Sequence, residues 1–211
     1  EKLLQKLWNA SKLVDSLTPE TVPELEEAEL SALDRWLLAE LDAEAAFVEE
    51  KLAAREFSKA RDSLRSFFWG TFCDDYLEIA KQRVREEDDE SAKYTLTVAH
   101  RRFLKLFAPI LSHITEEIWQ ELYAGSEDGS DGFRSVHRTA WPEPTGIDAD
   151  HDAGETAMAV VGALRRYKSE RQLPLNAELS TVSVYGGIDG FENDIRNVMH
   201  VGSLETLDAE P

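Results

Sequence analysis

Apolar side chains between residues 56 and 85 recur mostly at steps of three and four, the period of an α-helix. The pattern predicts one helix of about thirty residues with a buried face. The apolar positions are Phe57, Ala60, Leu64, Phe67, Phe68, Phe72, Tyr76 and Ile79. Between them lie Arg65, Trp69, Asp74, Asp75, Glu78 and Lys81, a mixed aromatic and charged ridge. We interpret this ridge as a candidate working surface; the alternative is a solvated face with Trp69 in the core.

Three further helical patterns precede residue 125. The first covers residues 1–17, the second runs from Ser31 to about residue 54, and the third leads from the acidic turn at 86–90 to Leu122. Four long helices with short connections predict an antiparallel bundle over residues 1–124.

Capping and helix-breaking residues predict where these helices begin and end. Ser31 is a candidate N-cap, with Asp34 three residues further on. Pro109 must kink or break the last pattern. Ser112 or Thr115 is then the expected cap of the helix that restarts.

The last third of the chain predicts a different architecture. Residues 125–149 are rich in turn formers and predict an extended loop that crosses the bundle. Residues 150–211 predict a C-terminal helix plus a small α/β subdomain: a helix to about 171, a strand at 179–185, a short helix at 191–201 and a strand at 203–207. The expected fold class is mainly α, an antiparallel helical bundle followed by this appendage.

The chain is very acidic. Its 211 residues include 23 basic and 42 acidic ones, giving a formal charge of −19. Such a surface repels phosphate backbones at low salt, which argues against a sequence-independent nucleic-acid binder. Either the partner is not a nucleic acid, or the protein works in a high-salt cytoplasm, where the Debye length falls to about 3 Å at 1 M. The even spread of the acids favours the second explanation.

The composition predicts a soluble cytoplasmic protein. No apolar run approaches the roughly 18 residues of a membrane helix, and the N-terminus lacks a signal-peptide pattern. We therefore expect no membrane partner. Cys73 is the single cysteine, so no internal disulfide and no cysteine-based zinc cluster can form.

No constellation of acid, base and nucleophile stands out, so we expect no catalytic residue in this chain. The histidines lack the spacing of a helical metal pair, and no metal site is predicted. Cys73 beside two aspartates is interpreted as a packing residue. Asp74, Asp75 and Glu78 are interpreted as a solvated acidic cluster, with divalent cation binding as the alternative.

A basic run stands out against the acidic background near residue 171. It consists of Arg165, Arg166, Lys168 and Arg171. The run can receive phosphate groups, or it can simply favour the C-terminal end of a helix. Both interpretations stay open.

Several segments resemble, in chain order, motifs of class I aminoacyl-tRNA synthetases. They are KLWNASKL (6–13), LDRWLLAEL (33–41), FFWGTFCDDYLEIAK (67–81), FAPILSHITEEIWQEL (107–122) and SVHRTAWP (135–142). The best resemblance is to the valyl-tRNA synthetase family, and ALRRYKSERQLPLN (163–176) is similar to the helix and loop of its archaeal-type members. Together these matches span nearly the whole chain. Asp75, where an aromatic residue is common, and Ala108 depart from the family pattern.

The resemblance implies the anticodon-binding helical bundle and small C-terminal α/β region of such an enzyme from a salt-adapted organism. The implied partners are the anticodon stem-loop of tRNA-Val and an N-terminal catalytic domain of the same polypeptide. Neither an HIGH-like nor a KMSKS-like motif occurs here, so ATP and Mg²⁺ are expected to act in that domain and no cofactor in this chain. Alternatives are the equivalent domain of an isoleucyl- or leucyl-tRNA synthetase, and a helical protein-interaction module with no RNA role.

By the same analogy, the first helix and the 69–81 helix line the anticodon cleft. Unpaired bases stack on aromatic rings and are read by polar side chains, while cations hold the backbone. Such recognition releases few counterions and therefore tolerates salt. The tRNA-binding residues that we expect are Trp8, Asn9, Lys12, Trp69, Tyr76, Glu78 and Lys81, together with the basic run Arg165, Arg166, Lys168 and Arg171.

Overall fold

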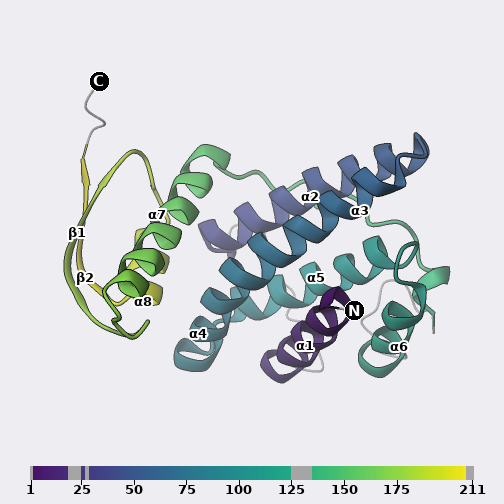
Figure 1. The fold of residues 1–211 in the computed structure, drawn as a ribbon, viewed down its shortest axis with the longest axis horizontal. Coiled ribbons are helices and arrows are strands. Elements are labelled where there is room, and N and C mark those ends of the chain that lie inside the picture. The colour runs from purple at the N-terminus through teal and green to yellow at the C-terminus, as the bar shows by residue number, and fades with distance from the viewer. Residues whose placement is uncertain (1, 19–24, 27–28, 125–134, 208–211) are drawn as a thin grey trace. The chain divides into compact units, whose positions relative to one another are not determined.

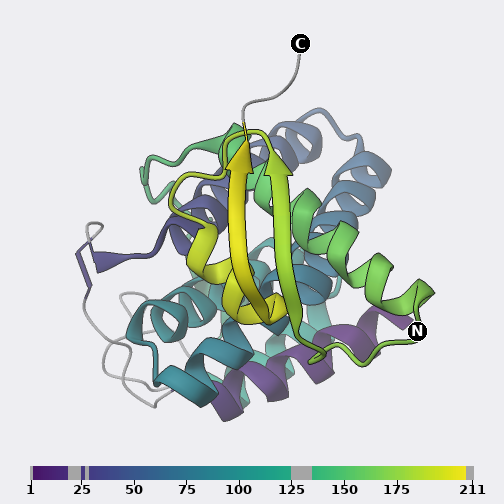
Figure 2. The ribbon, with the colours of Figure 1, turned by 90° about the vertical axis from the view of Figure 1, so that its left-hand side faces the viewer.

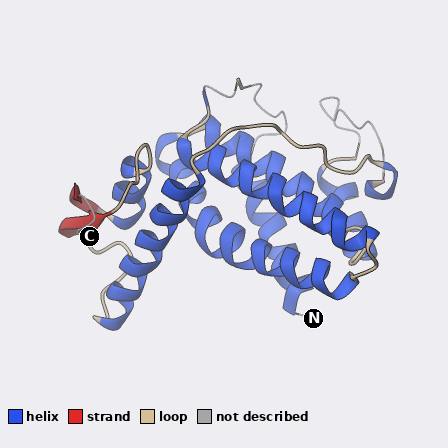
Figure 3. Cartoon of the chain, turned by 90° about the horizontal axis from the view of Figure 1, so that it is seen from above, coloured by secondary structure: helices blue, strands red, loops and turns tan. Residues whose placement is uncertain are grey.

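The computed structural model describes residues 2–18, 25–26, 29–124 and 135–207 (Figure 1). The predicted mainly helical class with a small α/β appendage is confirmed. The elements are α1 (Lys2–Leu17), α2 (Ala32–Ala53), α3 (Phe57–Ser66), the π-helix η2 (Phe67–Tyr76), α4 (Leu77–Glu87), α5 (Glu90–Phe107), α6 (Ser112–Leu122), the 3₁₀-helix η3 (Val136–Arg138), α7 (His151–Glu170), β1 (Leu179–Tyr185), α8 (Glu192–Met199) and β2 (Val201–Leu207). Among the described residues, strands occur only as β1 and β2 (Figure 3).

The elements form two compact units. The first comprises Glu1–Leu30 and Leu37–Ile147, and it contains the helical bundle. The second comprises Ser31–Trp36 and Asp148–Pro211, and it contains the two strands. No helix within the described ranges is both long enough and apolar enough to cross a bilayer.

Aromatic rings form the centre of the bundle. The ring centroid of Phe103 lies 5.1 Å from that of Phe68 and 4.8 Å from that of Phe72, and Phe68 meets Phe107 edge-on at 5.4 Å. All four side chains are fully buried. The cluster joins η2 to α5, and it shows why the 56–85 pattern predicts a buried face: large rings occupy its repeating positions.

The middle of the predicted 56–85 helix is a π-helix. The backbone N–H of Leu77 donates to the carbonyl of Phe72, five residues earlier. Strict four-residue steps keep one face buried through this region, at Leu64, Phe68, Phe72, Tyr76 and Ala80. In an α-helix of 3.6 residues per turn, each such step drifts by about 40° around the axis, so a wider turn is needed to hold these residues on one side.

Two positions of the predicted apolar face are corrected. Phe57 is 62% exposed because it begins α3, immediately after the turn from α2, and the buried face starts only at Ala60. Phe67 is half-buried, at the point where η2 begins and the helical register changes.

The predicted helix ends are largely confirmed. Ser31 Oγ accepts the backbone N–H of Asp34 at 3.2 Å, so Ser31 caps α2. α5 ends at Phe107 and α6 begins at Ser112, which places the predicted break around Pro109. The capping prediction there is wrong, because α6 has no side-chain cap; the hydroxyl of Thr115 instead donates to the Leu111 carbonyl at 3.1 Å.

The predicted extended loop lies partly outside the described residues, because 125–134 are not described. Its remainder is attached to the bundle by two carboxylates. Glu116 of α6 accepts the Ser135 hydroxyl at 3.0 Å and the Val136 N–H at 3.1 Å. Asp42 of α2 accepts both the N–H and the hydroxyl of Thr145 at 2.7 Å. These contacts hold the segment extended between α6 and α2.

The second unit is a parallel pair of strands with α7 and α8 (Figure 2). Leu179 pairs with Val201 and Tyr185 with Leu207. α8 supplies the crossover that a parallel pair requires. The predicted first strand is confirmed, while the second begins at Val201, two residues before its predicted start.

A close approach to Trp36 fixes one position of α7. An ideal Cβ added to Gly154 would lie 2.1 Å from Cδ1 of Trp36. Both residues belong to the second unit, and the Trp36 side chain is buried. The indole therefore lies directly on the helix backbone, where only the missing side chain leaves room.

Candidate nucleic-acid-binding surface

A lysine of α1 joins two residues of η2. Lys6 Nζ lies 2.8 Å from Asp74 Oδ1, although the two residues are 68 positions apart in sequence. The same nitrogen lies 5.3 Å from the ring centroid of Trp69, within the range of a cation–π interaction. We call Lys6, Trp69 and Asp74 the α1–η2 cluster.

The electrostatic setting keeps Lys6 charged. Partial burial by itself lowers the pKa of Lys6, but the hydrogen bond that Lys6 donates to Asp74 and the nearby charges of Asp74 and Glu78 outweigh it, so the pKa is raised. Lys6 was not among the expected tRNA-binding residues. No sequence signal connects it to a partner so distant in the chain.

The expected residues of α1 lie at the surface. Asn9 and Lys12 are exposed, and Trp8 is half-buried. Lys12 Nζ lies 5.0 Å from the ring centroid of Trp8, so α1 carries a second lysine–indole pair. An indole partly open to solvent can still stack on a base, and Asn9 adds a donor and an acceptor beside it.

The expected residues at the end of η2 and on α4 divide into two kinds. Glu78 and Lys81 form an ion pair with each other, with Glu78 exposed and Lys81 half-buried. Tyr76 is 0% exposed, and its ring stacks on Phe72 at a centroid distance of 6.2 Å. The expectation that Tyr76 presents its ring to RNA is therefore wrong, because it belongs to the buried four-residue series.

A buried series of hydrogen bonds holds α1 in place. The hydroxyl of Ser11 donates to the Leu7 carbonyl at 2.8 Å and lies 2.8 Å from His100 Nε2, so Nε2–H donates to Ser11. His100 Nδ1 then accepts the hydroxyl of Tyr123 at 2.5 Å. These hydrogen bonds link α1, α5 and the residue that follows α6.

This arrangement requires a neutral imidazole. Complete burial, with a further contribution from the charge of Arg101, lowers the pKa of His100 to about 3. Burial likewise raises the pKa of the Tyr123 hydroxyl, which therefore remains a donor. No sequence pattern indicates these hydrogen bonds, because Ser11 lies on α1, His100 on α5 and Tyr123 just after α6.

Cys73 directly precedes Asp74 of the α1–η2 cluster and senses the charges of both Lys6 and Asp74. It is buried, and burial raises the pKa of its thiol to about 12, despite the opposing charge of Lys6. A thiol in this state is a poor nucleophile, which agrees with the interpretation of Cys73 as a packing residue.

The basic run of α7 belongs to the second unit and is split by burial. Arg166 and Arg171 are exposed, and Arg171 lies over the ring of Tyr167 at 5.3 Å. Arg165 is half-buried. The exposed arginines remain available to an anionic partner.

Lys168 differs from its neighbours because it is 0% exposed. Its ammonium donates to the carbonyls of Leu175 and Met199 at 2.7 and 2.8 Å, and burial lowers its pKa. Its expected role as a tRNA contact is therefore wrong, because its charge holds two backbone segments together inside the unit.

Metal ligands do not converge in the described part of the chain. No group of three or more histidine, cysteine, aspartate or glutamate side chains there is arranged to hold an ion.

The family model described as the anticodon-binding domain of tRNA ligase matches residues 34–183. This chain therefore belongs to the anticodon-binding domain family of tRNA ligases.

Similar curated proteins are valine–tRNA ligases. One, from the halophilic archaeon Haloarcula marismortui, is 58% identical over the whole chain. Another, from Thermococcus kodakarensis, is 35% identical over the whole chain, and one from Natronomonas pharaonis is 35% identical over 85% of it. The chain spans only 22%, 24% and 20% of these three relatives, respectively.

Proposed function

We propose that this chain binds the anticodon stem-loop of tRNA as part of a valine–tRNA ligase. The observation that carries the proposal is the surface of α1 and η2, where two partly exposed indoles each lie within 5.3 Å of a lysine. The family match and the valine–tRNA ligase relatives support it.

The surface suits unpaired nucleotides. Bases of an anticodon loop can stack on Trp8 and Trp69, with Asn9 reading a base edge and Lys12 holding the backbone. Stacking contributes about 1 to 3 kcal/mol per base and is less sensitive to salt than phosphate contacts. Binding of this kind is compatible with a protein of charge −19.

The rest of the enzyme would supply the chemistry. ATP-dependent activation of valine, with Mg²⁺, belongs in this proposal to a catalytic domain of the same polypeptide, and this chain contributes recognition. We place the enzyme in the cytoplasm of a salt-adapted organism. Unfolding of the chain at low KCl, with recovery at molar KCl, is the measurement that checks the salt adaptation.

Fluorescence anisotropy with labelled anticodon stem-loops tests the recognition. At molar KCl, we expect the valine loop to bind at least about tenfold more tightly than a loop of scrambled sequence. Loops for isoleucine and leucine serve as matched competitors. Equal binding of the valine and scrambled loops would overturn the proposal and favour a protein-interaction module.

A further inference from the structure

We propose that Lys6, Trp69 and Asp74 act as one nucleotide-binding unit, with a base on the indole and its phosphate on the Lys6 ammonium, which Asp74 positions. The proposal rests on the proposed function and deepens it, because it assigns Lys6 and Asp74 roles in the α1–η2 cluster. The ligand is a nucleotide of single-stranded RNA.

The π-helix makes this unit geometrically possible. Trp69 and Asp74 are five residues apart, and both lie within reach of the one Lys6 ammonium. In an α-helix, residues at this separation point about 140° apart around the axis. The i to i+5 pattern of η2 brings them close to the same side. π-helical turns are rare in proteins overall, and those that occur are often found at functional sites.

Charge and exposure suit the proposed division of roles. The Lys6 side chain is 30% exposed and that of Asp74 is 52% exposed, so a ligand can reach the cation without unfolding either helix. At about 1 M salt the Debye length is near 3 Å, so the repulsion from distant acids is screened while the 2.8 Å contact persists. Asp74 therefore fixes the ammonium beside the indole, where base and phosphate of one nucleotide lie close together.

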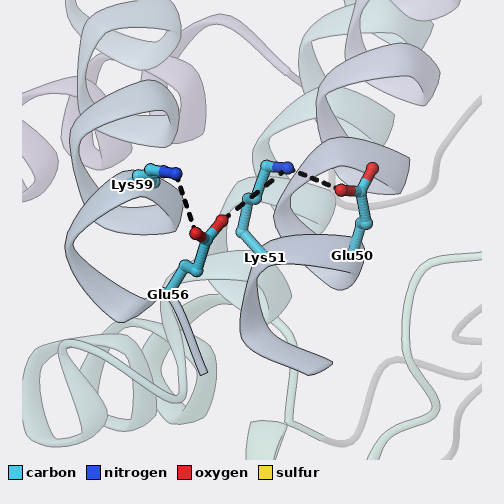
Figure 4. Close-up of polar contacts among 4 residues, drawn as sticks. All are labelled: Glu50, Lys51, Glu56 and Lys59. Carbon is cyan, nitrogen blue, oxygen red and sulfur yellow. Dashed lines mark hydrogen bonds and ion pairs between the residues drawn. The ribbon is translucent and has the colours of Figure 1, made fainter. Parts of the chain in front are cut away.

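A second cluster with the same chemistry provides a matched control (Figure 4). Lys51 Nζ lies 2.5 Å from Glu50, 3.8 Å from Glu56 and 5.0 Å from the ring centroid of Phe47. Glu56 also pairs with Lys59 at 2.8 Å. We call these residues the α2–α3 turn cluster. All its contacts are local to the turn, and none of its residues belongs to the proposed binding surface.

A double-mutant cycle tests whether the unit acts as one. Binding of the valine anticodon stem-loop to the 211-residue chain is measured by anisotropy at molar KCl for Lys6→Met, Trp69→Leu and the double variant. We expect each single change to weaken binding about tenfold, and the double change to weaken it no more than the larger single one. Lys51→Met, Phe47→Leu and their combination leave binding unchanged.

Three further variants separate positioning from folding. Lys6→Arg and Trp69→Phe keep a cation and a ring, and we expect them to retain affinity within about threefold of the wild type. On an Asp74→Asn background, the coupling between positions 6 and 69 should fall from about tenfold to near one. The thermal unfolding midpoint of every variant identifies losses that come from instability.

The outcomes distinguish this inference from the function on which it rests. Failure of the wild-type chain to prefer the valine loop overturns the proposed function and this unit with it. Preference for the valine loop, with losses at positions 6 and 69 that multiply to about a hundredfold, overturns only the unit. Unchanged coupling on the Asp74→Asn background removes Asp74 from it.

Discussion

The α1–η2 cluster and the α2–α3 turn cluster contain the same three kinds of group, a lysine, a carboxylate and an aromatic ring. In the first, Lys6 and Asp74 are 68 residues apart in sequence. In the second, Lys51 and Glu50 are neighbours, and Glu56 and Lys59 lie one helical turn apart. The local cluster needs only a tight turn, whereas the long-range one needs a correctly docked helix and an unusual helical register. The same kinds of contact can therefore arise either from residues that are close in sequence or from the packing of distant helices against each other.

The largest effect that sharpens this comparison is expected at His100, which holds α1 in place. The pKa of His100 in the folded chain, about 3, lies below the value of 6.5 that is usual for a histidine in an unfolded chain. The unfolded state therefore binds the proton first, so the stabilisation is complete above pH 6.5 and is lost as the pH falls toward 3. The shift corresponds to up to about 5 kcal/mol.

His100→Gln keeps two hydrogen-bonding ends but does not titrate. Urea unfolding at pH 7 should show a loss of about 1 to 3 kcal/mol from the altered bonds with Ser11 and Tyr123. Between pH 6.5 and pH 4, the stability of the variant should fall less than that of the wild type. Parallel curves for the two proteins would show that His100 does not titrate on unfolding.

The next effect concerns the access of reagents to Cys73, the buried residue that precedes Asp74 of the α1–η2 cluster. Burial raises the pKa of Cys73 from 9.0 to about 12, which lowers its thiolate fraction about 1000-fold at neutral pH. Alkylation by iodoacetamide should therefore be at least about 1000-fold slower in the native chain than in urea. Rapid native labelling would indicate that α1 opens from η2. The α2–α3 turn cluster has no cysteine and serves as an unlabelled region in peptide mapping.

A smaller effect is expected at Gly70, inside η2. A Cβ added there meets no heavy atom within 4 Å. Gly70→Ala should stabilise the chain by up to about 1 kcal/mol, because alanine loses less backbone entropy in a helix. Urea unfolding measures the change. Destabilisation would instead mean that the π-helical register depends on glycine at this position.

The smallest effect is expected in the α2–α3 turn cluster itself. Lys59 and Glu56 form an exposed pair, and such pairs contribute little to stability. Lys59→Gln should shift the thermal unfolding midpoint by less than about 2 °C. A larger shift would show that the turn cluster contributes to stability as a network and that the two clusters differ less than their geometry suggests.

The periodicity of apolar residues in the sequence was sufficient to predict most of the fold. Helical spacing predicted the bundle, and Ser31 and Pro109 marked real boundaries. The π-helix was missed, although a signal was present: the buried positions from Leu64 to Ala80 fall at uninterrupted steps of four. An α-helix mixes steps of three and four, so a long series of fours indicates a wider turn.

The surface was only partly predictable. Asn9 and Lys12 lie where a polar helix face predicts them. Tyr76 was expected at the RNA-binding surface by analogy with the family, and Lys168 as a member of the basic run, yet both side chains, each with a polar tip, are buried. Pattern alone cannot distinguish a tip that meets solvent from one that meets a protein partner. Lys6 and Asp74 could not be paired because nothing local relates α1 to η2.

The contact between Gly154 and Trp36 constrains how this domain can evolve. Even a methyl group on residue 154 would overlap the indole, since a Cβ there would lie 2.1 Å from Cδ1. A saturation library at this position should return glycine alone. A homologue with a larger residue at position 154 must carry a smaller residue than tryptophan at position 36. The two codons are therefore expected to change together or not at all.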